Sequence, residues 1–448
     1  MATIATAEQK VYKAGVIVPW TFLPKRPSDE RLAETTGLVE ALGCDLAFVR
    51  SEHLRKPNAS FLLSGGLLDR LAEDAVLHDV SLVVVDGALT PIQQRNLEKR
   101  LGLKVIDRTG LILEIFGLRA RTKEGLLQVE LARLLYERSR LVRTWTHLER
   151  QRGGRGFLGG PGETQLEADK RMIDRKVQRL RRDLADVERT RLVQRAGRVR
   201  HEVPVMALVG YTNSGKSTLF NKLSGAGVLA KDMPFATLDP AIRHIQLPNL
   251  GAAVLVDTVG FITELPTHLI DSFRATLEET LSADLLIHVR DRASAADVSQ
   301  KQDVLDILSQ LGEKSEHPAP PIIEAWNKVD LLGDDAREDL DFIAAAQSDT
   351  VAVPISALAG TGIESLYLAI EQTLSDKQAL LEVAMTPQDG ALRAFLYKSF
   401  HVEAEDYLSD GTGRLSVRLS ARELGRLYAH FPDVEISDET STKSRSQF

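Results

Sequence analysis

Apolar and polar positions follow a strand–helix alternation over the first part of the chain. Four short apolar runs, GVIVPW, DLAFVR, SLVVVDG and LKVIDRT, are separated by stretches with helical spacing, among them 31–42 and 91–101. Strands that alternate with amphipathic helices are typical of a mostly parallel sheet. We therefore predict an N-terminal α/β domain over residues 1–120.

The spacing changes from 121 to 200, where apolar residues recur at alternating steps of three and four. Two such runs flank a short glycine-rich break, which predicts two long helices packed as an antiparallel hairpin. The predicted seam of the first helix is Leu127, Leu131, Leu134, Leu141, Trp145 and Leu148, with Arg138 at one position, and that of the second is Leu166, Ile173, Val177, Leu180, Leu184 and Val187.

Strand–helix alternation returns in the second half of the chain. It predicts a central domain over residues 203–376 with a mostly parallel sheet. A linker from Glu382 to Gly390 is followed by helix-like ALRAFLYKSF, alternating GRLSVRLS and helix-like ARELGRLYAHF, so a small α+β domain is expected within 382–434. The polar stretch 437–448 is expected to be a disordered tail. The predicted fold class is thus α/β, with a helical hairpin and a small α+β module added.

Composition narrows the class of protein further. A chain of 448 residues is too long for one hydrophobic core, and its net charge of −7 means that nucleic-acid binding requires a local basic surface. Cys44 is the single cysteine, which excludes an internal disulfide and is more consistent with a small buried residue than with thiol catalysis. The start MATIATAEQK has no apolar secretory core, and no apolar run is long enough to span a bilayer. We expect a cytoplasmic protein without stable membrane association.

A phosphate-binding loop follows the strand-like run VMALVG. Residues 210–217 read GYTNSGKS and precede a helical segment, which is the context that the GxxxxGK[ST] motif requires. In this motif backbone amides surround the phosphates, Lys216 neutralises the β- and γ-phosphates, and Ser217 supplies an oxygen to Mg²⁺. The predicted nucleotide contacts here are Gly210, Tyr211, Thr212, Asn213, Ser214, Gly215, Lys216, Ser217 and Thr218.

Three later motifs complete a guanine-nucleotide site. In VLVDTVG, Asp257 ends a buried strand and is expected to hold Mg²⁺ through water, while the Gly260 amide senses the γ-phosphate. In NKVD, the Asp330 carboxylate can accept two hydrogen bonds from guanine that adenine does not offer. In SAL, the Ala357 amide is placed to meet guanine O6. The nucleotide contacts predicted from these motifs are Asp257, Gly260, Asn327, Lys328, Asp330, Ser356, Ala357 and Leu358.

The metal ligands and catalytic groups come from the same motifs. A switch threonine must close over Mg²⁺ when the γ-phosphate is present, and Thr237 in FATLDP is our choice, although a simple loop threonine is the alternative. The predicted metal ligands are Ser217, Thr237 and Asp257, and the predicted catalytic residues are Lys216, Thr237 and Gly260. Phe261 stands where many GTPases place a glutamine that orients the attacking water, so either another group positions the water or turnover is slow without a partner.

A basic surface is predicted on the second hairpin helix and at the glycine-rich break. The helix carries an excess of arginine over acid, and six glycines lie between Gly153 and Gly162. A solvated helix face and a flexible loop are the alternatives to an RNA-binding surface. The candidate RNA contacts are Arg152, Arg155, Phe157, Lys170, Arg171, Arg175, Arg179 and Arg182.

These motifs, together with GPGETQLEADKR and LTPIQQRNLEKRLGLKVIDRTGLILEIF, resemble the HflX family of ribosome-associated P-loop GTPases. The resemblance implies a GTPase that uses Mg²⁺, binds the large ribosomal subunit, and places the 153–162 loop toward the ribosome's catalytic centre. Some relatives also hydrolyse ATP. Asn213 resembles the P-loop asparagine of GTPases that bind K⁺ in place of an arginine finger, with a structural role as the alternative.

The leading functional hypothesis is a GTP-hydrolysing switch that binds the large ribosomal subunit and dissociates or rescues ribosomes under stress. The alternative is a GTP-gated RNA-binding factor in large-subunit assembly. A GTPase for tRNA modification and a membrane-associated switch have no support from cysteine, histidine or apolar patterns. The expected partners are GTP or GDP, the large subunit and ribosomal RNA, not DNA. The two heptad runs can satisfy each other, so we expect a monomer.

Overall fold

The computed structural model divides the chain into two compact units. One comprises Met1–Gln246 with Gly251–Ile363, and the other comprises Leu247–Leu250 with Glu364–Phe448. The structure describes residues 12–21, 29–151, 161–199, 203–225, 234–263, 269, 280–312, 320–347, 350–375, 379–386, 388–407 and 412–419, together with parts of 424–438. Within these residues, no helix is long and apolar enough to cross a membrane.

The N-terminal sheet has four parallel strands in the order β2-β1-β3-β4. This confirms the predicted α/β alternation, and the helices at 65–77 and 108–119 add two elements that the prediction did not name. Cys44 is buried, as expected. The elements are β1 (Lys13–Trp20), α1 (Asp29–Ala41), β2 (Asp45–His53), α2 (Gly65–Leu77), β3 (Leu82–Val85), α3 (Pro91–Leu101), β4 (Lys104–Asp107) and α4 (Arg108–Arg119).

Helix α3 shows how local sequence fixes an element. Thr90 accepts a hydrogen bond from the Gln93 amide at 3.2 Å, and the Gln93 side chain accepts one from the Thr90 amide at 2.9 Å. This capping box, with Pro91 in the first turn, satisfies donors that a helix start leaves unpaired. Gly102 ends the helix in the left-handed conformation that glycine tolerates best.

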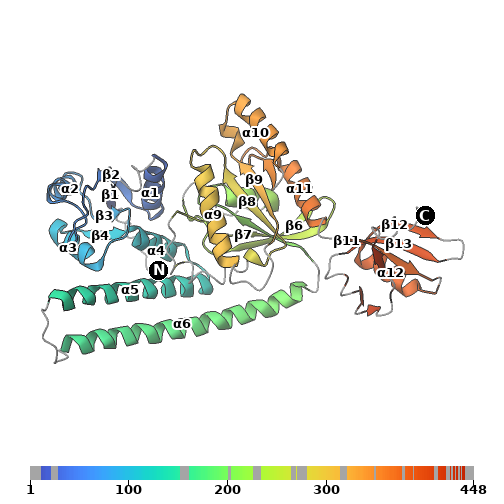
Figure 1. Ribbon diagram of the computed structural model, residues 1–448, viewed down its shortest axis with the longest axis horizontal. Coiled ribbons are helices and arrows are strands. Elements are labelled where there is room, and N and C mark those ends of the chain that lie inside the picture. The colour runs from blue at the N-terminus through green and yellow to red at the C-terminus, as the bar shows by residue number, and fades with distance from the viewer. Residues whose placement is uncertain are drawn as a thin grey trace, which may run out of the picture. The chain divides into compact units, whose positions relative to one another are not determined.

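The helical hairpin consists of α5 (Lys123–Gln151) and α6 (Pro161–Val199), which run side by side (Figure 1). Its seam buries Leu131, Leu134, Val177 and Leu180 in one cluster, and the two helices, joined at one end, run antiparallel, as predicted (Figure 1). Arg138, the polar residue of the predicted seam, donates a hydrogen bond to Asp174 across the hairpin at 2.9 Å. Side chains at seam positions 145, 148 and 166 lie outside the described residues.

The central sheet has six strands in the order β10-β9-β8-β5-β7-β6. The pairs β10–β9, β9–β8, β8–β5 and β5–β7 are parallel, so the prediction of a mostly parallel sheet is confirmed. The elements are β5 (Val205–Val209), α7 (Lys216–Ser224), β6 (Ala241–Leu247), β7 (Gly251–Asp257), β8 (Leu285–Asp291), α9 (Asp297–Gly312), β9 (Ile322–Asn327), η1 (Val329–Leu331), α10 (Asp334–Ala346) and β10 (Val351–Pro354).

The second unit contains an antiparallel sheet in the order β12-β13-β11-β14. The predicted linker at 382–390 is wrong in its first residues, because Glu382 lies inside a strand. The predicted tail also begins too early, since Ser437 pairs with Glu382; residues 439–448 lie outside the described residues. The elements are α11 (Ile363–Ser375), β11 (Ala379–Met385), α12 (Gly390–Ser399), β12 (His401–Tyr407), β13 (Gly413–Leu419) and β14 (Ile436–Asp438).

Candidate nucleotide-binding site

The phosphate-binding loop connects β5 to α7 and needs glycine at its last turn. Gly215 has φ +97°, a left-handed conformation that side-chain-bearing residues rarely adopt. A Cβ atom on Gly215 would lie 2.1 Å from the Asn327 side-chain nitrogen. That nitrogen instead donates a hydrogen bond to the Ser214 carbonyl at 2.8 Å. The loop and the NKVD motif are therefore packed directly against each other.

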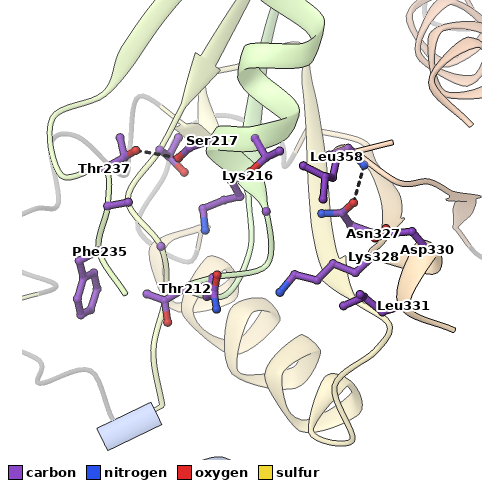
Figure 2. Close-up of a pocket in the computed structure, with 17 residues that line it drawn as sticks. Thr212, Lys216, Ser217, Phe235, Thr237, Asn327, Lys328, Asp330, Leu331 and Leu358 are labelled. Carbon is purple, nitrogen blue, oxygen red and sulfur yellow. Dashed lines mark hydrogen bonds between the residues drawn. The ribbon is translucent and has the colours of Figure 1, made fainter. Parts of the chain in front are cut away.

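The base-recognition motifs meet at Asn327. Its side-chain oxygen accepts a hydrogen bond from the Ala357 amide at 2.9 Å, which ties the NKVD segment to the SAL segment (Figure 2). Lys328 has φ +66°, and its ammonium lies 2.7 Å from the Asp291 carboxylate at the end of β8. Both motifs follow the carboxyl ends of parallel strands, where open α/β sheets bind their ligands.

One cavity of about 350 Å³ brings most of the predicted nucleotide contacts together (Figure 2). The predicted residues that line it are Thr212, Asn213, Gly215, Lys216, Ser217, Thr218, Thr237, Gly260, Asn327, Lys328, Asp330, Ala357 and Leu358. The predicted residues outside the lining are Gly210, Tyr211, Ser214, Asp257 and Ser356. Four lining residues were absent from the prediction, and two of them, Phe235 and Ala236, lie in the FATLDP motif. The other two are Thr258 and Leu331.

Tyr211 departs most from its predicted place. Its phenol lies outside the cavity lining and donates a hydrogen bond to Glu34 of α1 at 2.7 Å. The same oxygen accepts a hydrogen bond from the Thr263 amide at 2.9 Å. Burial and the Glu34 charge raise the pKa of Tyr211, so the phenol stays protonated. The side chain therefore belongs to a packing contact of the loop rather than to the phosphate cradle.

Lys216 is the buried cation of the site. Its ammonium donates hydrogen bonds to the carbonyls of Gly210 at 3.0 Å and Tyr211 at 2.7 Å. Burial lowers the pKa of Lys216 to about 8, and the charge of Asp257 opposes that shift. A group that has lost hydration and lies on a phosphate-binding loop interacts strongly with an incoming polyphosphate.

Three oxygen-bearing side chains converge beside Lys216. Ser217 Oγ lies 2.9 Å from Thr237 Oγ1, and both hydroxyls donate to Asp257 Oδ2, at 2.8 and 3.0 Å. The other carboxylate oxygen, Asp257 Oδ1, is buried and has no hydrogen-bond partner. Burial raises the pKa of Asp257, while Lys216 and the two hydroxyls oppose the shift.

This cluster fits a hard divalent cation. Hydroxyl and carboxylate oxygens, supplemented by water and phosphate oxygens, are the ligands that Mg²⁺ takes in nucleotide sites. The orphaned Asp257 oxygen is an acceptor that a metal-bound water would satisfy. The described residues contain no group of three or more His, Cys, Asp or Glu side chains that could hold a metal without such additional ligands.

Phe261 occupies the glutamine position of many GTPases but points into the core. It is 2% exposed, and its backbone forms a parallel bridge to Tyr211. The Thr212 amide donates to the Phe261 carbonyl at 2.7 Å, and the Phe261 amide donates to the Gly210 carbonyl at 3.1 Å. The side chain therefore cannot reach an attacking water.

The basic surface is described only on the helix. Arg152, Arg155 and Phe157 lie outside the described residues. On α6, the predicted contacts Lys170, Arg171, Arg175, Arg179 and Arg182 are all exposed.

The fold and the site define the class: the chain is a P-loop GTPase with a guanine-recognition motif. Four family profiles match its sequence: "GTP-binding GTPase N-terminal" over 29–117, "GTP-binding GTPase Middle Region" over 119–198, "50S ribosome-binding GTPase" over 205–328 and "HflX C-terminal domain" over 341–438. The chain belongs to the HflX family of GTPases, and it hydrolyses GTP.

Curated relatives share most of their length with this chain. GTPase HflX of Magnetococcus marinus is 44% identical over 406 residues, which cover 88% of this chain and 89% of that protein. GTPase HflX of Escherichia coli is 42% identical over 404 residues, covering 90% and 93%. The crystal structure of a GTP-binding protein from the archaeon Sulfolobus solfataricus in complex with GDP is 26% identical, with a TM-score of 0.45, and covers 82% of this chain and 99% of that one.

Proposed function

We propose that this GTPase is a switch that binds the large ribosomal subunit in its GTP form and dissociates or rescues ribosomes under stress. The observation that carries the proposal is the basic face of α6. Residues 170–189 contain eight Lys and Arg residues against four Asp and Glu residues. The match of residues 205–328 to a ribosome-binding GTPase profile supports the same partner.

Four arginines of α6 form one stripe opposite the seam. Arg171, Arg175, Arg179 and Arg182 follow each other at steps of four, four and three, which places them on one helix face. Arg171 pairs with Glu167 at 2.9 Å. Within the described residues, Arg175, Arg179 and Arg182 form no ion pair. A solvated face held by i,i+4 pairs would compensate these charges, so the stripe favours a polyanion such as ribosomal RNA.

The nucleotide site supplies the switch. With Mg²⁺ bound, Ser217 and Thr237 would be its protein ligands, with Asp257 acting through water, and the metal would neutralise charge on the β- and γ-phosphates. Lys216 would contact the same phosphates, and the Gly260 amide would sense the γ-phosphate. Loss of the γ-phosphate would remove the contacts that hold Thr237 and Gly260 over the nucleotide, and the ribosome would then be released.

The first test is GTP hydrolysis with and without purified large ribosomal subunits. We expect strong stimulation by mature subunits, because Phe261 cannot orient water and an external partner must complete the site. Stimulation only by precursor subunits would instead establish the alternative, a GTP-gated factor in subunit assembly. A comparison of potassium with sodium buffer tests whether Asn213, which lines the cavity, holds a K⁺ ion.

The basic stripe is tested by the triple variant Arg175→Gln, Arg179→Gln and Arg182→Gln. Loss of three phosphate contacts should weaken subunit binding at least tenfold and make it less dependent on salt. The matched control replaces Arg95, Lys99 and Arg100 of α3, which changes the net charge equally but leaves the hairpin intact. Equal losses in both triple variants would mean that only overall charge matters.

Deletion of residues 153–162 tests the glycine-rich loop. The deletion should leave GDP affinity unchanged and remove the ribosome-dependent stimulation. An unchanged response to ribosomes would exclude a contact by this loop.

The switch threonine is tested by Thr237→Ala. The variant should lose affinity for a non-hydrolysable GTP analogue with Mg²⁺ about tenfold or more, and should bind GDP almost as well as the unmodified protein. Equal affinities of the variant and the unmodified protein for both nucleotides would show that Thr237 is an ordinary loop residue.

A further inference from the structure

The segment around Thr237 is anchored in the N-terminal part of the same compact unit. Phe235 is 2% exposed, and its ring meets Phe116 of α4 edge to face, with centroids 4.7 Å apart. Leu238 is buried in the same hydrophobic core. Phe235 and Leu238, on either side of Thr237, are therefore held by packing in the hydrophobic core, while Thr237 itself lies against Ser217 and Asp257.

Asp239, two residues after Thr237, binds the start of helix α5. Its Oδ2 accepts hydrogen bonds from the amides of Arg121 at 2.8 Å and Thr122 at 2.9 Å. Its Oδ1 accepts one from the Thr122 hydroxyl at 2.5 Å. Helix starts leave amides unpaired and favour negative charge, so Asp239 acts as a cap supplied by a distant part of the chain.

We propose that Asp239 is a positioning residue for Thr237, so that closure of the switch over the γ-phosphate and ordering of the first turn of α5 are one coupled event. The inference rests on the proposed role of Thr237 as the switch threonine. It extends that role, because it makes the base of the helical hairpin sensitive to the nucleotide.

Chain geometry supports the coupling. Two residues span at most about 7 Å, so Thr237 cannot withdraw far from Ser217 and Asp257 without moving Leu238 and Asp239. Movement of Asp239 would leave the amides of Arg121 and Thr122 without their acceptor. The GTP form, in which Thr237 is held by Mg²⁺, would keep the cap in place, and the GDP form would release one restraint on it.

The main variant is Asp239→Ala. Loss of a charged cap should reduce affinity for a non-hydrolysable GTP analogue about tenfold and lower the maximal rate of GTP hydrolysis by a similar factor. GDP affinity should change less than twofold, because Thr237 has no γ-phosphate to close over in that state.

Asp389→Ala is the matched control. Asp389 also accepts from a backbone amide and a threonine hydroxyl, those of Thr386, both at 2.7 Å. It belongs to the other compact unit, so its loss should leave both nucleotide affinities unchanged. An equal loss of analogue and GDP affinity in Asp239→Ala would mean that this residue only stabilises the fold, which overturns the proposal.

Gly125→Ala separates helix stability from contact with the switch. Alanine is a better helix former than glycine, so the change should favour α5 itself. A Cβ at position 125 would however lie 2.2 Å from Asp239 Oδ1 and displace that carboxylate. We expect the same selective loss of analogue affinity as in Asp239→Ala. An unchanged ratio of the two affinities would overturn the positioning role.

Hydrogen exchange gives a second readout that does not depend on catalysis. In the unmodified protein, amides at the start of α5 should exchange more slowly with the GTP analogue than with GDP, and Asp239→Ala should abolish the difference. No nucleotide dependence in the unmodified protein would overturn the coupling. If Thr237→Ala loses its preference for the GTP analogue over GDP while Asp239→Ala and Gly125→Ala keep theirs, only this inference fails. If Thr237→Ala keeps that preference unchanged, the assignment of Thr237 as the switch threonine fails.

Discussion

Tyr211 of the phosphate-binding loop and Glu34 of α1 are joined by a 2.7 Å hydrogen bond across 177 positions of sequence. The bond is formed by a buried phenol whose oxygen also accepts from the Thr263 amide. Thr263 follows closely after the DTVG motif, so one side chain links the loop, the segment after Gly260 and the N-terminal domain.

Replacing this phenol should cost stability. Tyr211→Phe removes the hydrogen bonds to Glu34 Oε2 and to the Thr263 amide, whereas Glu34 Oε1 keeps its contact with Arg108. We expect the free energy of unfolding to fall by about 1–3 kcal/mol. Urea unfolding of the variant and the unmodified protein measures the change. Tyr397→Phe is the control, because Tyr397 donates to Glu405 at 2.7 Å on an exposed surface. A loss no larger than in the control would contradict the expectation.

The lowered pKa of Lys216 predicts how GDP affinity depends on pH. Lys216 titrates near pH 8 in the free protein, and bound phosphates favour its charged form. Below this pH the ammonium is already charged, so affinity is flat. Above it, binding must take up a proton, and affinity should fall by up to about tenfold per pH unit.

Titrations with GDP between about pH 7.5 and about pH 9 test this dependence. Lys216→Arg should bind GDP with little change over the same range, because a guanidinium keeps its charge. Lys216→Ala should lose tight binding altogether. Parallel curves for the unmodified protein and Lys216→Arg would assign the titration to another group.

Asp330 should determine the choice of base. Asp330→Asn exchanges one carboxylate acceptor for an amide donor, so the guanine N1–H and 2-amino groups lose a partner, while the 2-oxo group of xanthine gains one. We expect GTP affinity to fall by roughly a hundredfold or more, with a gain for xanthosine triphosphate. Competition binding measures both affinities. Asp335→Asn, on the exposed start of α10, should leave them unchanged, and an unaltered base preference in Asp330→Asn would remove Asp330 from the site.

Introducing glutamine at position 261 should not create a faster enzyme. The Phe261 side chain lies in the core, so Phe261→Gln would bury an amide and lower the free energy of unfolding by about 1–3 kcal/mol. Intrinsic GTP hydrolysis should not increase. Phe261→Leu, which keeps an apolar side chain, serves as the control in unfolding and hydrolysis assays. An increased rate in Phe261→Gln alone would place residue 261 beside the attacking water.

Much of the site follows from short motifs. The glycines and Lys216 of the phosphate-binding loop, together with Asn327 and Asp330, act through local backbone geometry that a few consecutive residues specify. The bounds of helix α3 are equally local, because Thr90 and Gln93 cap its start and Gly102 ends it. Such features depend on neighbours in sequence and can be predicted from the sequence.

Other features depend on distant partners. Asp239 is 117 residues from Thr122, and nothing in FATLDP indicates that its aspartate caps a helix. The sequence shows Phe235 only as an apolar residue and does not indicate that its ring packs against Phe116. Strand β14 has three residues and pairs with β11, so its order comes from the neighbouring strand rather than from its own polar sequence.

The Arg138–Asp174 pair bears on how far the hairpin can extend. Helix α5 has 29 residues and so a length of about 43 Å. Beyond the pair, seven residues added to each helix would preserve the seam and carry the tip about 10 Å farther. An unequal insertion would put apolar residues opposite polar ones. The length of the hairpin can therefore change only in steps of seven residues in each helix. Relatives with longer or shorter hairpins should differ from this chain by the same multiple of seven residues in both helices.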